Sequence, residues 1–407
     1  MTTATKYKTY SKYKPSGIDW LGDIPAGWET KKLKYGFYFT KGKNAALYTA
    51  EYNAEHAGDH PVYSGQTEGE GIMGLIDSYD YDFEKVIFTT TVGAKVMTPL
   101  LLSGKFSLSQ NCLLMIKSSK QVFEKYFYYQ LFPLFDREKS LVPSHMQPSL
   151  RFSDLNTFDV AYPEIDEQKS IVDFLDRETA KIDEMVAKKQ KMMELLKEKR
   201  QALITHTVTR GLNPKAKMKP SGIDWLGNIP AAWEVKRLKY VALLGYGSSL
   251  PEEKRNDAGE IPVYGSNGLI GYHDQYITKK PVIVVGRKGS YGKLTWVDTE
   301  CFPVDTTYFI DEASTKNNLR WVYYCLSILK LDEGSQDSAV PGLAREKVYT
   351  TMIGLPFGID QKEMVVFLDR ETAKIDEMVK KVETQIEKLQ EYRQALITNA
   401  VTGKIKV

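Results

Sequence analysis

Two long islands of this chain occur twice, and this internal repeat constrains the fold more than any other feature. The first island, KPSGIDWLGDIPAGWETKKLKY, begins at Lys14 and returns with few changes at Lys219, 205 positions later. The second, FLDRETAKIDEMV, begins at Phe174 and returns letter for letter at Phe367, 193 positions later. Such self-similarity indicates two copies of one structural unit, so we expect a chain built of two related halves.

The segments between the islands diverge, apart from a turn pattern shared by PVYSGQTEGEGIMG and PVYGSNGLIG. The second island repeats its polar residues as faithfully as its apolar ones, although a buried core would constrain only the apolar positions. We therefore infer that the islands perform one task twice, whereas the divergent segments perform two related but different tasks. The alternative is that the islands are only a framework that both halves need. The repeated polar residues are Asp176, Arg177, Glu178, Lys181, Asp183 and Glu184.

A long helical pattern follows the first divergent segment, from Gln168 to about Thr205, without glycine or proline. Apolar residues recur there every seven positions with charges between them, and the second copy repeats this spacing, which is typical of long coiled-coil helices. Lys189 interrupts the first row, where it weakens the seam or fixes its register. The expected packing row is Leu175, Ile182, Leu196 and Leu203 in one helix and Leu368, Ile375, Val382, Leu389 and Leu396 in the other. The expected second row includes Ile171, Met185, Met192, Met364 and Met378.

Local signals delimit these helices: Pro163 and Pro356 precede them, and Gly211 and Gly403 occupy positions where they should end. The divergent segments contain β-branched and aromatic runs, such as KVIFTTTV, NCLLMIK, PVIVVG and TTYFI, which predict strands of a small mixed sheet. Each segment then ends in an aromatic helical stretch. We expect an α+β chain with two mixed α/β domains, at residues 1–163 and 212–356, and with two long helices, at 164–211 and 357–407.

Bulk properties narrow the class of protein. The 407 residues carry a formal charge of only +3, which neither indicates nor excludes local basic surfaces for nucleic acid. Cys112, Cys301 and Cys325 lack paired spacing, which favours reduced thiols over a disulfide or zinc framework. The sequence has no apolar run of membrane-spanning length and no signal-peptide core, so we expect a cytoplasmic protein without a membrane partner.

Two short motifs resemble ligand-binding sites, but their residues do not have the spacing or context that such sites require. The loop GRKGSYGKL has five residues between Gly286 and Gly292, and Leu294 stands where a P-loop needs Ser or Thr to bind magnesium. His56 and His60 enclose a glycine and precede a proline, which prevents the helix that such a metal-binding pair requires. We find no catalytic constellation, and we expect this chain to bind no metal or cofactor.

Together these features resemble the specificity subunit of a type I restriction-modification system, and the resemblance covers nearly the whole chain. It rests on IPAGWETKKL and IPAAWEVKRL, which open the two halves, and on PVYGSNGLIGYHD, VIVVGRKGSYGKL and SAVPGLAREKV in the second divergent segment. The ordered series, which ends in LPFGIDQKEMVVFLDRETAKID, occurs twice and is more specific than any one motif. Two departures are TTTVGAKVM in place of the first half's glycine loop and IDQK in place of a Glu-Gln pair.

The resemblance implies two target recognition domains separated by two long antiparallel coiled-coil helices. Each domain would read one half of a bipartite, asymmetric site in double-stranded DNA, and the helix length would set the gap between the halves. The chain itself would not be an enzyme. Its partners would be two methylation subunits, which use S-adenosylmethionine to methylate adenine, and restriction subunits, which use ATP and Mg in phage defence.

The resemblance also assigns a role to the loop GRKGSYGK, whose basic residues would reach DNA phosphates and base edges while its glycines allow close approach. Arg287 is our first candidate for a bidentate contact to guanine. The alternative for each candidate is a solvated turn residue. The other candidates in the second domain are Lys288, Ser290, Tyr291, Lys293, Ser266, Asn267, His273, Ser335, Gln336 and Arg345. Those in the first domain are Gln66, Thr67, Thr90, Lys95, His145, Gln147 and Arg151.

The repeated polar helix residues are candidates for binding partner subunits, in particular Arg177 and Lys181 with their copies Arg370 and Lys374. Exposed helix charges that bind nothing are the alternative. Two other functions stay open from the sequence. One is a stand-alone DNA-binding regulator with two half-site modules, which would bind DNA tightly without partners. The other is a coiled-coil scaffold protein, which would bind no DNA.

Overall fold

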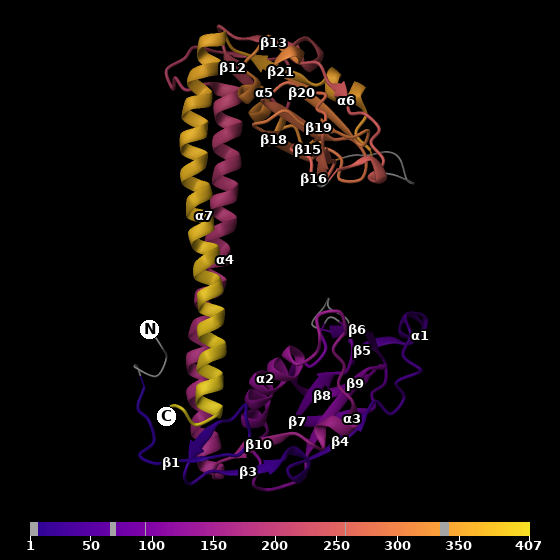
Figure 1. Ribbon diagram of the computed structural model, residues 1–407, viewed down its shortest axis with the longest axis vertical. Helices are drawn as coiled ribbons and strands as arrows, with labels where there is room; N and C mark the ends of the chain where they lie inside the picture. Colours follow the sequence, from indigo (N-terminus) through magenta and orange to yellow (C-terminus); the bar gives the residue numbers. More distant parts are fainter. Residues whose placement is uncertain (1–6, 66–70, 94, 257, 334–341) are drawn as a thin grey trace. The chain divides into compact units, whose positions relative to one another are not determined.

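The computed structural model describes residues 7–65, 71–93, 95–256, 258–333 and 342–407. The chain forms two compact units: the first runs to Gln190 and resumes over Thr384–Val407, and the second is Lys191–Glu383. Each unit contains one α/β domain and one stretch of each of two long helices, α4 (Ile165–Arg210) and α7 (Gly358–Val401) (Figure 1). The sequence-based prediction of an α+β chain with two mixed domains and two long helices is confirmed.

The domain of the first unit is built around one six-stranded sheet with the order β4-β9-β7-β8-β5-β6. Two antiparallel pairs, β1 with β2 and β3 with β10, lie outside this sheet. The strands are β1 (Tyr13–Pro15), β2 (Asp23–Pro25), β3 (Glu29–Lys32), β4 (Phe37–Lys41), β5 (Ala57–Tyr63), β6 (Ile72–Ile76), β7 (Tyr81–Thr90), β8 (Pro99–Leu108), β9 (Cys112–Lys117) and β10 (Asp159–Tyr162). The helices of this domain are α1 (Ala50–Glu55), α2 (Glu124–Ser140) and α3 (Phe152–Leu155), with a 3-10 turn at Leu33–Tyr35.

The domain of the second unit divides its strands between a four-stranded sheet, β14-β20-β17-β18, and a three-stranded sheet, β16-β15-β19. The pairs β11 with β12 and β13 with β21 repeat the two outer pairs of the first domain. The strands are β11 (Met218–Pro220), β12 (Asn228–Pro230), β13 (Glu234–Arg237), β14 (Gly245–Tyr246), β15 (Ile261–Gly265), β16 (Gly268–His273), β17 (Val282–Gly286), β18 (Leu294–Val297), β19 (Phe302–Pro303), β20 (Thr307–Asp311) and β21 (Met352–Leu355). The helices are α5 (Leu319–Leu326) and α6 (Arg345–Thr350), with 3-10 turns at Leu238–Tyr240, Glu252–Lys254 and Glu312–Ser314.

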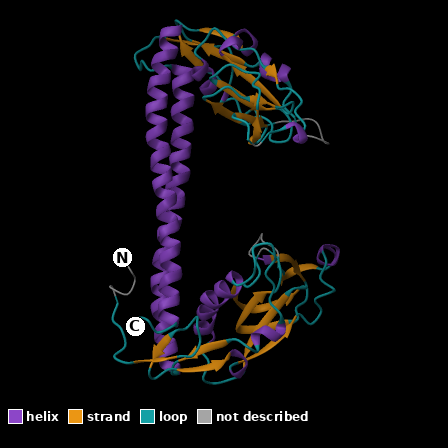
Figure 2. Cartoon of the chain, in the orientation of Figure 1, coloured by secondary structure: helices purple, strands orange, loops and turns teal. Residues whose placement is uncertain are grey.

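The two cores follow from the apolar runs read in the sequence. All five residues of β17 are buried, as expected for a central strand covered on both faces. The aromatic stretches form α5 and most of α2, which bury Trp321 and Tyr324 in one unit and Tyr126 and Phe127 in the other. Figure 2 shows that in each unit these helices lie between the sheet and the long helices.

Within each unit α4 and α7 run side by side in opposite directions (Figures 1 and 2). The leucine row faces the interior: Leu175, Ile182, Leu196, Leu368, Ile375, Val382 and Leu396 are buried, and Leu203 and Leu389 pack partly buried against the two cores. Gly211, directly after α4, and Gly403, two residues after α7, both adopt a positive φ, as expected for residues that end helices.

The predicted phase of the second seam row is wrong. Met185, Met192 and Met378 are 43%, 47% and 38% exposed, although Ile171 and Met364 are buried. The second row instead lies four residues after each leucine-row position, at residues such as Thr179, Val186, Arg200, Thr372 and Arg393. Because Thr and Arg alternate in this row with apolar residues such as Val186 and Ile386, the hydrophobicity pattern alone does not identify it.

Candidate nucleic-acid interface

The glycine-rich loop between β17 and β18 is a tight turn closed by its own backbone. The amide of Gly286 donates to the carbonyl of Lys293, and the amide of Gly292 donates to the carbonyl of Gly286, both at 2.8 Å. Gly292 has a φ of +77°, and a Cβ there would lie 2.4 Å from the backbone of Asp332. The glycine is therefore required by both conformation and space, and the loop forms a tight turn at the end of β17.

The turn between β15 and β16 lies against this loop. The ammonium of Lys293 donates to the carbonyl and to the side-chain oxygen of Asn267, at 2.7 and 2.9 Å. A Cβ on Gly289 would lie 3.6 Å from the hydroxyl oxygen of Ser266. Ser290 is exposed, and Tyr291 is half-buried against the core. The structure thus brings together the loop and turn candidates that the sequence named, but it uses Lys293 to join the two segments.

Arg287 lies in a cluster of cations and tyrosines. Its guanidinium is 5.1 Å from the ring centre of Tyr246 and 5.8 Å from that of Tyr308, and it donates to the carbonyl of Asp305 at 3.1 Å. Arg345, the first residue of α6, places its guanidinium 4.7 Å from the same Tyr246 ring. Within the described parts of the chain, neither guanidinium has a carboxylate partner. Two arginines held on one exposed aromatic ring form a preoriented cationic surface.

The neighbouring Lys288 is exposed at the same corner, where a backbone bridge connects it to Gly342. His273 is not part of this cluster, because it ends β16, five residues or about 16 Å along the strand from Gly268. Its ring packs edge-on against Phe302, and its Nδ1 is buried without a hydrogen-bond partner within the described residues. The candidates Ser335 and Gln336 lie outside the described residues.

The first domain repeats this framework with different side chains. The amide of Leu150 donates to the carbonyl of Thr91 at 2.8 Å, just as the amide of Leu343 donates to the carbonyl of Arg287 at 2.8 Å. In both domains a short helix begins two residues after that leucine. The equivalents of Arg287 and Arg345 are therefore Thr91 and Phe152. The first domain lacks the arginine pair at this position.

The other candidates of the first domain differ in their exposure to solvent. The hydroxyl of Thr90 is buried and donates to the backbone carbonyl of Lys95, so it shapes the loop after β7. Both residues line a pocket of about 400 Å³ together with Tyr63 and Phe88. His145, Gln147 and Arg151 are exposed along the segment that leads into α3, and the amide of Arg151 donates to Asp154. Gln66 and Thr67 lie outside the described residues.

Two repeated polar residues anchor each domain to its long helix. The amide group of Gln168 is fully buried: its oxygen accepts from the amide of Phe123 at 2.8 Å, and its nitrogen donates to two backbone carbonyls. In the second unit the side-chain oxygen of Gln361 accepts from the amide of Asn318, and its nitrogen donates to the carbonyl of Pro356 and to the side-chain oxygen of Asn317. The carboxylate of Asp176 accepts from Lys125 and Tyr129, and that of Asp369 accepts from Arg320 and Tyr324. Sequence reasoning missed these anchors, although their identical repetition was a visible signal.

The partner-binding candidates remain on the surface. Arg177 and Lys181 both contact the carboxylate of Glu178, and Arg370 and Lys374 both contact that of Glu371. The hydrogen bond from Lys181 lowers the pKa of Glu178, and the bond from Lys374 lowers that of Glu371. Each unit thus presents one exposed triad of two cations around one carboxylate. Of the repeated polar residues, Asp176 and Asp183 instead bond to other helices, through Tyr129 and Arg393.

The described residues hold no group of three or more His, Cys, Asp or Glu side chains arranged to bind a metal ion. Among the same residues, no helix has both the length and the apolar composition of a membrane span.

Comparisons with known proteins agree with this geometry. The family described as "Type I restriction modification DNA specificity domain" matches residues 25–194 and 230–388. A Mycoplasma pneumoniae protein named as a type I specificity subunit is 24% identical over 330 residues, which are 79% of this chain and 84% of that protein. The specificity subunit of type I restriction enzyme MpnII from the same organism is 28% identical over 127 residues, or 31% of this chain and 37% of that protein.

A solved chain, described in terms of complex assembly and conformational transition of the type I R-M system, has the same fold. It superposes with a TM-score of 0.69 at 14% identity, over 93% of this chain and 98% of that chain. Since the family matches more than half of the chain, and in two separate segments, this chain belongs to the type I restriction-modification specificity subunits. The chain therefore has two target recognition domains, one for each matched segment.

Proposed function

We propose that this chain is the non-catalytic DNA-reading subunit of a cytoplasmic type I restriction-modification complex. The recognition domains, which we place at residues 1–163 and 212–356, each read one half of a bipartite, asymmetric site in double-stranded DNA. The helical segments 164–211 and 357–407 recruit two methylation subunits, which supply S-adenosylmethionine. Restriction subunits that use ATP and Mg join this assembly.

One observation carries the proposal: the two domains keep one framework and change its exposed side chains at the same place. The leucine amide that fixes the loop is preserved in both, whereas Arg287 and Arg345 in one domain are replaced by Thr91 and Phe152 in the other. Two readers of different base sequences require this pattern, because base edges are distinguished by side chains that a common scaffold positions. A scaffold protein that binds no DNA has no use for it.

In the second domain, Arg287 and Arg345 are the groups that we assign to base edges, with Tyr246 as their support. A guanidinium that lacks a carboxylate partner keeps its donors available for the two acceptors of guanine. Lys288 and Ser290 lie exposed on the same loop and suit phosphate contacts. We assign Lys293 and Tyr291 to holding the loop against the turn at Ser266 and Asn267.

In the first domain, we assign base or phosphate contacts to Lys95, His145, Gln147 and Arg151, which are not buried. Thr90 is given a role in shaping the loop, because its hydroxyl is already bonded inside the domain. The absence of an arginine pair on this framework predicts that the two half-sites differ in base composition.

The decisive experiment expresses this chain with cognate methylation subunits and sequences adenine methylation across a genome. We expect two short defined sequences separated by an unspecified gap. Replacing residues 212–356 with the same segment of a relative should change one half-site and leave the other intact. A single contiguous site, or changes in both halves, would contradict the proposal. Tight specific DNA binding by the chain alone would instead support the stand-alone regulator, and DNA-independent behaviour would support the scaffold.

A further inference from the structure

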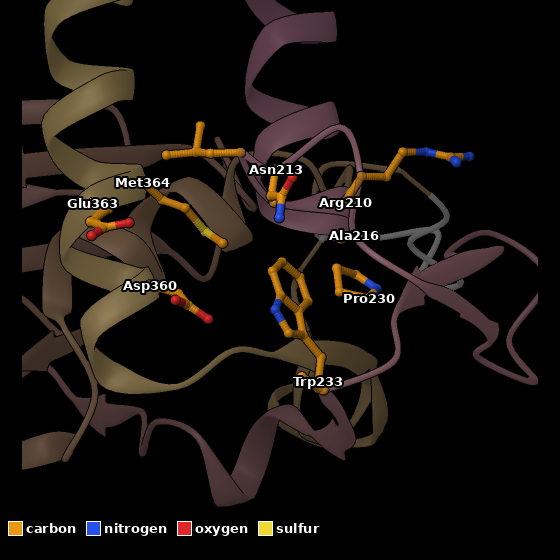
Figure 3. A pocket seen from close by; sticks show the side chains of 11 residues that line it. Arg210, Asn213, Ala216, Pro230, Trp233, Asp360, Glu363 and Met364 are labelled. Carbon is orange, nitrogen blue, oxygen red and sulfur yellow. The ribbon is translucent and has the colours of Figure 1, made fainter.

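A pocket of about 370 Å³ lies in the second unit, where α4 ends and α7 begins. Figure 3 shows the indole of Trp233 projecting into it, with Asp360, Glu363 and Met364 on the α7 side and Asn213 on the opposite side. This space, the Trp233 pocket, is lined by Arg210–Asn213, Ala216, Pro230, Ala232, Trp233, Asp360, Glu363 and Met364. All of these residues belong to the second unit, and Trp233 is only 3% exposed.

The first unit contains the same arrangement with an occupant. Trp28, the repeat equivalent of Trp233, donates its indole N–H to the carboxylate of Glu167 at 2.9 Å. The hydroxyl of Tyr10 donates to the other oxygen of that carboxylate at 2.7 Å, and its ring packs edge-on against Trp28 with centres 5.9 Å apart. The ammonium of Lys406 lies 5.9 Å from the Tyr10 ring. One phenol thus packs beside a hydrogen-bonded indole–carboxylate pair and bonds to the free oxygen of the carboxylate.

The second unit has the receptor residues but no tyrosine. The repeat places Asp360 at the position of Glu167 and Lys215 at the position of Tyr10. The backbone keeps its register, because Ala26 donates to the carbonyl of Lys12 and Ala231 donates to that of Lys217. Lys215 is exposed and does not line the pocket. The space that a phenol fills in the first unit is therefore left open in the second.

The pocket also contains an unsatisfied polar group. The indole N–H of Trp233 has no hydrogen-bond acceptor within the described residues, and Figure 3 shows its nitrogen on the side of the ring that faces Asp360. This nitrogen is open to the pocket rather than sealed in the core, so a ligand that offers it an acceptor adds a hydrogen bond. Two carboxylates, Asp360 and Glu363, line the pocket, whereas the first unit has Glu167 and Ser170 at these positions. The pocket therefore favours a hydroxyl donor with basic neighbours.

We propose that the Trp233 pocket binds the tyrosine side chain of a basic segment from a partner polypeptide, in the way that the first unit holds Tyr10. The phenol packs on Trp233, its hydroxyl donates to Asp360, and lysines beside the tyrosine face the carboxylates at the rim. The partner is a different chain rather than a second copy, because the chain's own Tyr10 is already bound within the first unit. This inference goes beyond the reading of DNA and does not depend on it.

A peptide copied from residues 7–17 of this chain is the probe, and the full-length protein is the receptor. We expect one peptide to bind per chain by calorimetry, since the first site is occupied. Replacing the tyrosine that corresponds to Tyr10 with alanine in the peptide should weaken binding at least tenfold. The receptor variant Trp233→Phe, which removes the indole donor and reduces the aromatic surface, should weaken binding severalfold.

The receptor variant Lys215→Tyr restores the tyrosine of the first unit and should fill the pocket from within. We expect it to reduce peptide binding at least tenfold, whereas Lys217→Tyr, which places a tyrosine two residues away, should leave binding unchanged. No binding at millimolar peptide, equal binding of the alanine peptide, or unchanged binding by Lys215→Tyr would overturn the proposal. Dimerisation that is lost in a Tyr10→Ala variant would overturn the assignment to a different chain.

Discussion

Arg200 of α4 donates two hydrogen bonds to the carboxylate of Asp376 of α7, at 2.8 and 3.3 Å. The same contact recurs in the first unit, where Arg393 donates to Asp183 at 2.9 and 3.3 Å. Each member of one pair lies 193 positions from its counterpart in the other, the displacement of the second island. The letter-for-letter repetition of these polar residues is therefore explained in part by helix pairing within each unit.

Removing the Arg200–Asp376 ion pair should lower the free energy of unfolding only slightly. Exchanging the two residues should recover that loss. Both side chains are partly exposed, so each contact should contribute roughly 0.2–1 kcal/mol to the free energy of unfolding. We expect Asp376→Arg alone to be destabilising, because it places two guanidinium groups together. The double variant Arg200→Asp, Asp376→Arg should approach the wild type in urea unfolding. Additive losses in the double variant would show that the two residues do not interact.

The buried glutamines Gln168 and Gln361 should contribute more to the free energy of unfolding than this ion pair. Gln168→Met keeps the side-chain volume but leaves the amide of Phe123 and two carbonyls without partners, which should cost about 1–3 kcal/mol. Gln361→Met should have a similar cost in the second unit. Gln190→Met, at an exposed position of the same helix as Gln168, is the matched control and should be neutral. Comparable urea midpoints for all three variants would refute the anchoring role.

Arg287 and Lys288 should separate base reading from phosphate binding. Arg287→Ala should relax or abolish recognition of one half-site at a cost of roughly 1–3 kcal/mol. Lys288→Ala should weaken binding to every sequence and lower the dependence of affinity on salt. Tyr246→Ala, which removes the support of Arg287, should resemble Arg287→Ala. Binding of the reconstituted complex to specific and random duplexes measures both effects, and equal losses on both for Arg287→Ala would make it a phosphate contact.

Charge reversal should test the exposed triads. Arg177→Glu with Lys181→Glu surrounds Glu178 with like charge and should reduce the methylation subunits per complex from two to one. The second triad, at Arg370 and Lys374, stays intact in this variant. Native mass spectrometry counts the subunits. Reversal of the exposed Lys188 and Lys191 is the control, and a loss of the same size there would indicate a general charge effect.

The three thiols should be unreactive in the folded protein. Burial raises the pKa of Cys112 to about 12 and that of Cys301 to about 11, and it raises the pKa of Cys325 as well. A raised pKa keeps the thiol protonated and non-nucleophilic throughout pH 7–9. A chromogenic disulfide reagent should therefore label none of them at either pH, and all three in urea. Rapid labelling of one thiol under native conditions would contradict this burial.

The repeat and the apolar runs sufficed to predict two α/β domains and two long helices, because these features are determined by local pattern. The second seam row could not be found, since it mixes apolar residues with polar ones such as Arg200, whose partner Asp376 comes from the distant helix. The support of Arg287 was also hidden, because Tyr246 lies forty-one positions away and meets it only through the pairing of β14 with β20. Contacts of this kind depend on tertiary structure.

The anchor at Gln168 bonds only to main-chain atoms of the domain that it holds: the amide at Phe123 and the carbonyls at Gln121 and Pro163. This anchor bonds to no side chain of the domain, so it requires only that the main chain follow the same path. The second anchor is more demanding, because Asp176 bonds to the side chains of Lys125 and Tyr129. Exposed residues of the domain that touch neither anchor are free to vary while the domain stays attached, and the side chains to which we assign DNA contacts are of this kind.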